Sequence, residues 1–369
     1  MFVLAILIAT SVISMQLLKN KVNNSTIKYA KEETIPANSS TSNEQDKSTN
    51  NDKSPEEIKS INLMVLGEIM MGGKVSKNLE YDYLMAFKDI YEKTKETDFT
   101  YANFSTNITN LDSIDDARSE YLVTKDVLNA LNALGVDALS IANDHITDFP
   151  GDIIKNTVNI LEENNIFVAG RENMPVYFEK GGKKIAIVST NSVIIGTSSN
   201  YTKNGISLYE QENIKKNIAE AKKMADFVIA DIHWGKGESS FGITEQMKEM
   251  AKFVIDNGAD LVMGTHAIGI QPIEIYNNKP IIYTSGYLIT DLEYETTKVS
   301  YMFNLNFNED VKLTEIAMTP IYIKDQKETL LYKNCDEVQA NINMKSLNSR
   351  NIENGINSNI ENDKIIIRF

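Results

Sequence analysis

Cysteine and histidine are both scarce in this chain. Cys335 is the only cysteine among 369 residues, which excludes an intrachain disulfide and a cysteine-based metal cluster. We interpret Cys335 as a structural residue rather than a catalytic thiol. The three histidines are His145, His233 and His266, so any chemistry that requires an imidazole depends on these side chains.

Positive charge is also in short supply. The 37 Lys and Arg residues are outnumbered by 51 Asp and Glu residues, which gives a formal net charge of −14. We therefore expect no nucleic-acid partner, because an acidic domain repels phosphates. The same charge repels an anionic polymer at long range, although salt screens the repulsion and a local site can oppose it.

The first 18 residues contain no charged side chain. As a helix they would rise about 27 Å, close to the roughly 30 Å apolar thickness of a bilayer. Because no small-x-small cleavage site or lipobox cysteine follows, we expect residues 1–19 to be an uncleaved transmembrane anchor, rather than a signal peptide or a core helix. Lys19, Lys21, Lys28 and Lys31 come after this segment and by the positive-inside rule would place the domain in the cytoplasm, so the residues alone leave the orientation open.

Composition divides the rest of the chain into three parts. Residues 20–60 are rich in Asn, Ser, Thr, Lys and Glu and poor in large apolar groups, which predicts a disordered linker. Residues 324–369 are rich in asparagine, and we expect a loosely ordered C-terminal tail. Residues 61–323 form the folded domain.

Within that domain, short apolar runs alternate with amphipathic stretches. The predicted strands are Ile61–Leu66, Phe99–Phe104, Ala138–Ala142, Ile185–Ser189, Phe227–Ile232, Leu261–Met263 and Ile281–Thr284. The predicted helices are Leu79–Thr97, Lys125–Leu134, Asp152–Asn164, Glu210–Met224 and Glu245–Asn257. This order is typical of an α/β fold with much parallel pairing, and the alternating runs at Tyr301–Phe307 and Leu313–Ile323 indicate an antiparallel finish.

Each histidine follows a predicted strand. His145 comes after ALSIAND, His233 after FVIADI and His266 after LVMGT. Ligands of open α/β sheets gather beyond the carboxyl ends of the strands. One histidine in such a place usually has a structural role, but all three share it, so we predict that they line one site.

Carboxylates and amides accompany these imidazoles. Glu68 ends the first strand, Asn143 and Asp144 precede His145, and Asp231 lies two residues before the next histidine, on the same face of its strand. Each carboxylate alone would be read as a helix cap or a solvated loop residue. Together with imidazoles they suit a divalent metal such as zinc, manganese or iron, and a two-metal centre would activate water against a phosphoryl group.

Other signatures are weak. In GEIMMGGK, Lys74 comes one residue too late for a phosphate-binding loop, and Val75 stands where a hydroxyl should bind magnesium. No nucleophile elbow occurs, because Phe241 takes the place of its second glycine. Trp234, the only tryptophan, is either a platform for substrate or a core residue.

Six features occur together in the order and spacing seen in CapA-type poly-γ-glutamate capsule biosynthesis proteins: LGEIMMGG, SIANDHITD, ADIHWGKGE, DNGADLVMGTH, IQPIEIYNNKPIIYTSG and the closing Asp291. The chain resembles that family over residues 61–320. The resemblance implies a fold related to calcineurin-like metallophosphatases, a sandwich of two mixed β-sheets flanked by helices. It also implies a domain anchored at the outer face of the cell membrane, with a part in making, exporting or attaching poly-γ-glutamate alongside a membrane synthetase complex.

The expected roles of the site residues follow from these motifs. The expected metal ligands are Glu68, Asn143, His145, His233 and His266. The expected catalytic residues are Asp144, His145, Asp231 and His233, with Asp144 or Asp231 as general base. The expected substrate-binding residues are Asn103, Trp234 and Glu238.

The chain also departs from the family pattern. Glu68 replaces the usual aspartate, Asn103–Ser105 replaces N-L-E, and Asn143–His145 reads N-D-H instead of N-N-H. The G-H-x-P-H region appears as Gly264–Ile268 without a second imidazole, and G-N-F has become Gly286–Leu288. Two hypotheses therefore stand, a metal-dependent hydrolase or transferase and a non-catalytic envelope protein that binds polymer or synthetase. A third, weaker one is an anchored protein that faces the cytoplasm.

Overall fold

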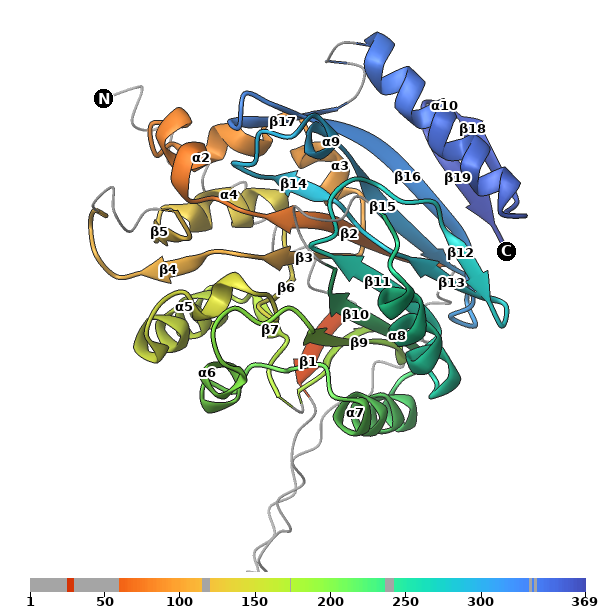
Figure 1. Ribbon diagram of the computed structural model, residues 1–369, viewed down its shortest axis with the longest axis horizontal. Helices are drawn as coiled ribbons and strands as arrows, with labels where there is room; N and C mark the ends of the chain where they lie inside the picture. The colour runs from red at the N-terminus through yellow and green to blue at the C-terminus, as the bar shows by residue number, and fades with distance from the viewer. Residues whose placement is uncertain are drawn as a thin grey trace, which may run out of the picture.

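Two mixed β-sheets pack against each other at the centre of the molecule, and helices cover their outer faces (Figure 1). The structure is a computed structural model that describes residues 25–29, 60–114, 120–172, 174–235, 242–331, 334 and 337–369. The predicted α/β sandwich of two mixed sheets is confirmed.

The larger sheet has ten strands, with the order β18-β19-β16-β15-β2-β3-β6-β7, and β14 and β17 attached beside it. Its strands are β2 (Ile61–Ile69), β3 (Phe99–Phe104), β6 (Ala138–Ser140), β7 (Phe167–Ala169), β14 (Tyr287–Ile289), β15 (Val299–Phe307), β16 (Leu313–Lys324), β17 (Glu328–Leu331), β18 (Ser358–Glu361) and β19 (Lys364–Arg368). Strands β2, β3, β6 and β7 run parallel, and β15 and β16 form the predicted antiparallel finish.

The smaller sheet has seven strands, with the order β1-β8-β9-β10-β11-β13-β12. Its strands are β1 (Ser25–Tyr29), β8 (Val176–Lys180), β9 (Lys183–Asn191), β10 (Phe227–His233), β11 (Leu261–Thr265), β12 (Glu274–Tyr276) and β13 (Lys279–Ile282). The four central strands β9, β10, β11 and β13 are parallel, and antiparallel strands complete both edges. A separate parallel pair joins β4 (Asn107–Thr109) to β5 (Leu122–Thr124).

Four of the five predicted helices form close to their expected positions: α4 (Val127–Leu134), α5 (Gly151–Glu163), α7 (Gln211–Met224) and α8 (Glu245–Asp256). The single helix predicted for Leu79–Thr97 is wrong. The structure has α2 (Gly73–Asn78), the 3₁₀ helix η1 (Tyr83–Phe87) and α3 (Tyr91–Lys95) instead. Glu80 and Tyr81 adopt positive φ values of 51° and 64°, which an α-helix cannot contain.

Strand β2 shows why the sandwich forms. Leu63 and Val65 face the core between the sheets, whereas Met64 and Leu66 face the cluster under helices α4 and α5. A strand that is apolar on both faces must be covered on both sides, because its side chains alternate between them. Helices α7 and α8 cover the outer face of the smaller sheet in the same way.

The prediction of a loosely ordered tail is wrong for residues 337–369. They form helix α10 (Glu337–Glu353), β18 and β19, and β19 pairs antiparallel with β16. Despite the asparagine-rich composition, apolar residues recur at regular spacing in this segment. Ile365 and Ile367 of β19 point into the core between the sheets, and Met344 and Leu347 of α10 pack against the same core. These side chains bury enough apolar surface to order the segment.

Strand β1 lies within the segment expected to be a linker. Its Tyr29 hydroxyl donates a hydrogen bond to Glu162 (2.7 Å) and accepts one from the Val168 amide (2.8 Å), and Arg171 lies 5.4 Å from the ring centre. The rest of the expected linker before residue 60 and the expected anchor at 1–19 lie outside the described residues. Within the described part of the chain, no helix is long and apolar enough to cross a membrane.

Candidate metal centre

Polar side chains from both sheets meet where the parallel strands end. In the larger sheet Glu68 is paired in register with Asn103, and in the smaller sheet His233 is paired with Thr265. Asn143 and Asp144 follow β6, and His266 follows β11. These residues therefore lie together at the carboxyl ends of the parallel strands, which is where ligands of such sheets bind.

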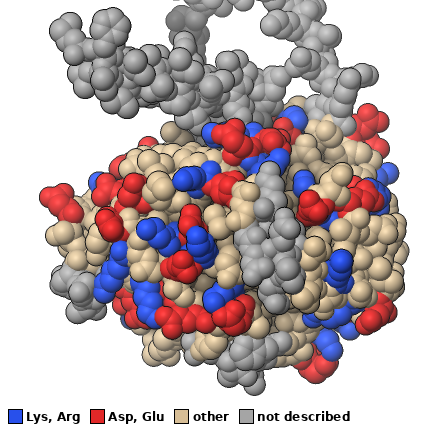
Figure 2. Space-filling model, turned by 90° about the horizontal axis from the view of Figure 1, so that it is seen from above, with Lys and Arg blue, Asp and Glu red and all other residues tan. Residues whose placement is uncertain are grey.

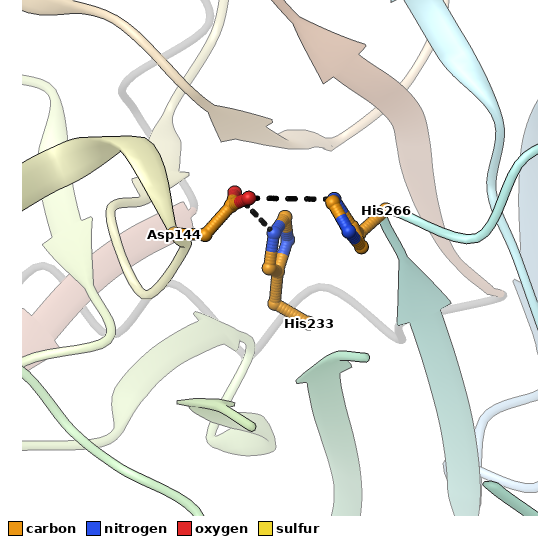
Figure 3. Close-up of side chains that lie close together, drawn as sticks. All are labelled: Asp144, His233 and His266. Atoms are coloured by element: carbon orange, nitrogen blue, oxygen red, sulfur yellow. Dashed lines mark hydrogen bonds and ion pairs between the residues drawn. The ribbon is translucent and has the colours of Figure 1, made fainter. Parts of the chain in front are cut away.

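Asp144 lies between two histidines at the centre of this region (Figure 3). Its Oδ1 atom is 2.9 Å from His233 Nε2, and its Oδ2 atom is 3.8 Å from His266 Nδ1. One ligand atom from each of the three residues lies within 4.8 Å of the others. A carboxylate and two imidazoles at this spacing are a donor set for a divalent transition metal.

His266 has a backbone conformation that is rare for a residue with a side chain. Its φ is 72°, in the left-handed region, directly after the last residue of β11. Such conformations persist where surrounding structure holds them, and they are common at functional sites. Two residues earlier in β11, Gly264 packs closely against Tyr283 and Trp234. A Cβ there would lie 2.2 Å from the Tyr283 carbonyl oxygen and 2.4 Å from Trp234 Nε1, so only glycine fits.

His233 is oriented from behind by a hydroxyl. Its Nδ1 is 2.9 Å from Thr265 Oγ1, and its Nε2 faces Asp144. A hydrogen bond at one ring nitrogen fixes which nitrogen is free to bind a ligand. Thr265 was not predicted as a site residue. It directly precedes His266 and pairs in register with His233, so the register of these two strands could have identified it.

His145 lies at the edge of the cluster. Its Nε2 is 3.6 Å from Asp144 Oδ2, and its Nδ1 is 3.0 Å from Asp148 Oδ2. The Tyr121 ring stacks on its imidazole with the ring centres 3.7 Å apart and the planes at 10°. Tyr121 is a second residue that sequence reasoning missed, because it comes from a segment more than 20 residues earlier in the chain. His145 is therefore held on three sides while its side chain remains 16% exposed.

Two buried oxygens near Asp144, on Glu68 and Asn143, have no partner among the described residues. Glu68 Oε1 accepts a hydrogen bond from Ser105, but among the described residues its Oε2 has no partner. Asn143 donates to Asn103 Oδ1 (3.2 Å) and to the Phe104 carbonyl (3.0 Å), and its own Oδ1 is likewise unpartnered within the described chain. Unpaired buried acceptors are costly, and a cation is one kind of partner that offsets this cost. The residues present therefore fit a divalent metal ion.

Burial and neighbouring charges shift the pKa values of the two carboxyl groups, Glu68 and Asp144. Burial raises the pKa of Glu68, with the nearby Asp144 carboxylate adding to the effect. Burial alone would also raise the pKa of Asp144, but the hydrogen bond and charge of His233 hold it well below its usual range. Asp144 is thus an anion at neutral pH, as a metal ligand must be.

The pKa values of His266 and His145 are shifted in opposite directions. Burial and the charge of His233 lower the pKa of His266 to about 4, so its imidazole is neutral and available as a ligand at neutral pH. Burial acts in the same sense on His145, but the hydrogen bond to Asp148 and the charge of Asp144 outweigh it and raise its pKa. His145 therefore favours the protonated form more than His266 does.

Two predicted site residues lie outside the cluster around Asp144, and a third is not among the described residues. Asp231 is fully buried between the sheets, where its carboxylate accepts hydrogen bonds from Tyr101 (2.5 Å) and Ser189 (2.8 Å), and burial raises its pKa. Trp234 is completely buried and donates to the Tyr283 carbonyl (2.8 Å), so the expectation that it binds substrate is wrong, and it is a core residue. Glu238 lies outside the described residues.

Comparisons with known proteins agree on a family. The model of the bacterial capsule synthesis protein family PGA_cap matches residues 62–292. The PGA biosynthesis protein CapA of Bacillus subtilis (strain 168) is 26% identical over 274 residues, 70% of this chain and 71% of that protein. The capsule biosynthesis protein CapA of Bacillus anthracis is 24% identical over 270 residues, 69% of this chain and 66% of that protein.

More distant similarities extend the comparison. A probable polyglutamine synthesis accessory protein of Mycobacterium tuberculosis (strain ATCC 25618 / H37Rv) is 26% identical over 219 residues, 53% of this chain and 57% of that protein. Among solved structures, a putative 5′-nucleotidase from Staphylococcus aureus is 13% identical with a TM-score of 0.44, over 79% of this chain and 58% of that one. That TM-score is too low to support an inference. The family match covers more than half of the chain, and it confirms the resemblance of the motifs: the chain belongs to the bacterial capsule synthesis protein family PGA_cap.

Proposed function

We propose that this protein is a divalent-metal-dependent hydrolase or transferase that acts in the synthesis, export or attachment of poly-γ-glutamate or a related envelope polymer. The family supports the capsule context. The observation that carries the enzymatic part is the group formed by Asp144, His233 and His266, beside the unpartnered oxygens of Glu68 and Asn143.

Each residue has a role in this proposal. Asp144, His233 and His266 hold the ion, zinc, manganese or iron, and Glu68 and Asn143 complete its ligands. The bound ion would supply Lewis-acid polarisation of the bond to be cleaved and a water of lowered pKa. Thr265 holds the His233 ring in orientation.

His145 is the proton donor of this proposal. It is the partly exposed histidine that Asp148 and Tyr121 hold in place at the edge of the cluster. Because its pKa is raised, its imidazolium persists to higher pH than that of an ordinary histidine and can protonate a leaving group.

We place the domain outside the cell, attached through residues 1–19. The uncharged first segment and the family's link to capsule synthesis support this placement. An acidic protein must still approach an acidic polymer. Figure 2 shows acidic and basic side chains interspersed on the face seen from above, so the net charge of −14 does not form a uniform acidic surface there.

A non-catalytic envelope protein is the second candidate function. The direct 2.9 Å contact between Asp144 and His233 favours it, because these two groups already satisfy each other without an ion. The absence of a second imidazole in Gly264–Ile268 acts in the same direction. Such a protein would bind the polymer or its synthetase at the same strand ends.

Two variants separate these candidates. The full chain would be loaded with zinc, manganese or iron, analysed for bound metal, and assayed against phosphodiester and γ-glutamyl substrates. We expect Asp144→Asn to lose both metal and activity, and Asp148→Asn to keep the metal and lose activity, because Asp148 contacts only His145 in the cluster. No metal above background under several loading conditions would refute the metalloenzyme and leave the binding protein.

A further inference from the structure

A cavity of about 570 Å³ lies outside the metal centre, between helix α10 and the loop that follows His266. Loop residues 268–271, the short helix α9 (Glu295–Lys298) and the C-terminal half of α10 form its walls. Its volume is within the range of roughly 300–1,000 Å³ that small-molecule sites occupy. One wall of this cavity comes from α10, in the segment that composition alone would assign to a tail.

The floor of the cavity is apolar. Ile268, Tyr301 and Leu347 line it, and each side chain is almost completely buried. Methylene or other apolar groups of a ligand can pack on this part of the wall, while its polar groups can meet the polar side chains that also line the cavity.

Two basic side chains line the cavity, and they differ in their ion pairing. Lys298 forms an ion pair of 2.5 Å with Glu295, which is 84% exposed. Arg350 also lines the cavity, and within the described chain no carboxylate lies at ion-pair distance from it. A guanidinium presents a planar fork of donors that matches a carboxylate. Arg350 can therefore form an ion pair with an anion bound in the cavity.

We propose that this cavity is a binding site for a carboxylate-bearing aliphatic chain, with Arg350 as the anchor of one carboxylate and the apolar floor beneath the chain's methylenes. A γ-linked glutamate segment has this alternation of methylenes and carboxylates, so the inference deepens the proposed function and rests on it for the identity of the polymer.

The cavity and the metal centre share one loop. Residues 266–273 begin at His266, pass along the cavity wall and end at Ile273, whose amide donates to Asn351 Oδ1 on α10 (2.9 Å). Helix α10 therefore fixes the far end of the segment whose first residue is a candidate ligand. A polymer held by Arg350 would be bound beside the loop that carries His266.

The test measures binding rather than catalysis. The full chain would be titrated calorimetrically with a short γ-linked glutamate oligomer, and with a glycerol-phosphate oligomer of equal charge, in the presence of a chelator that keeps the metal centre empty. Arg350→Gln should weaken binding of the glutamate oligomer about tenfold, the effect of losing one charge-assisted contact. Glu295→Gln should strengthen it about twofold to threefold, because it removes a rim carboxylate that competes for Lys298.

Lys345→Gln is the matched control. Lys345 is exposed on the same helix and does not line the cavity, so this variant makes the same charge change and should leave the affinity unchanged. Equal weakening by Lys345→Gln and Arg350→Gln would overturn the proposal, since it would show only general attraction. Absence of binding, or tighter binding of the phosphate oligomer, would also overturn it. Because no metal is involved, failure here is distinguishable from failure of the proposed enzymatic function.

Discussion

Replacing His266 with asparagine should flatten the acid side of the stability profile of the metal-free protein. The pKa of His266 falls from 6.5 to about 4 on folding, because its ring is buried and lies near His233. The unfolded chain therefore binds a proton more readily than the folded one. The stability that comes from excluding this proton is fully present above pH 6.5 and is lost as the pH falls toward 4.

The size of this effect follows from the pKa. One pKa unit corresponds to about 1.4 kcal/mol, so the change from 6.5 to about 4 is worth about 3 kcal/mol between these pH values. The His266 side chain is only 13% exposed, so solvent screening reduces this figure little. The charges of Asp144, His233 and His145 act on His266 as well, so the difference between variant and wild type is the informative quantity.

The assay is urea unfolding of the full chain in chelator at several pH values from 9 down to 4. The free energy of unfolding of His266→Asn should decline less than that of the wild type over this range. His145→Asn is an internal contrast of opposite sign, because a raised pKa contributes stability that is present below pH 6.5 and lost as the pH rises. If wild type and His266→Asn declined in parallel, the assignment of a buried, neutral His266 would be refuted.

Three further outcomes are expected. Asp144→Asn should lower the affinity for zinc or manganese at least tenfold in a competition titration, because it removes the anionic ligand between two imidazoles, and unchanged affinity would contradict the site. Gly264→Ala should lower the free energy of unfolding by about 1–3 kcal/mol through the clash with the Tyr283 carbonyl, whereas Gly242→Ala, where nothing lies within 4 Å, should change it by less than about 0.5 kcal/mol. The fluorescence of Trp234 should be blue-shifted and resistant to acrylamide, since the indole is fully buried, and efficient quenching would contradict its core position.

Much of the fold follows from the sequence because its central strands are locally unambiguous. Strand β10 begins with the apolar run Phe227–Ala230, which includes β-branched residues, and lies in the middle of a parallel sheet, where both faces are buried. Helix α10 could not be predicted in the same way. Its apolar residues Met344 and Leu347 are separated by polar ones, and their burial depends on a sheet formed by residues far away in the chain.

The site was predictable in place but less so in detail. The strand ends predict that His233 and His266 come together, and the structure places them with ring centres 4.7 Å apart. From the sequence, Asp144 or Asp231 is the expected general base, whereas the carboxylate of Asp144 lies between the two rings, where a ligand belongs. That position depends on the loop after β6 and on the positive φ of His266, and neither has a signature in a single sequence.

Strand β1 alters how the domain would be held at the membrane. If residues 1–19 occupy the bilayer as we propose, the chain between them and Ser25 can span at most about 20 Å before Ser25 enters the smaller sheet. The edge formed by β1 and β8 would then face the lipid headgroups at close range. Residues 30–59 would join two strands of the same domain instead of separating it from the membrane, and shortening them should leave the distance between Lys28 and the bilayer unchanged in a lipid cross-linking experiment. Reach toward a polymer would then come from the strand-end face rather than from the length of a stalk.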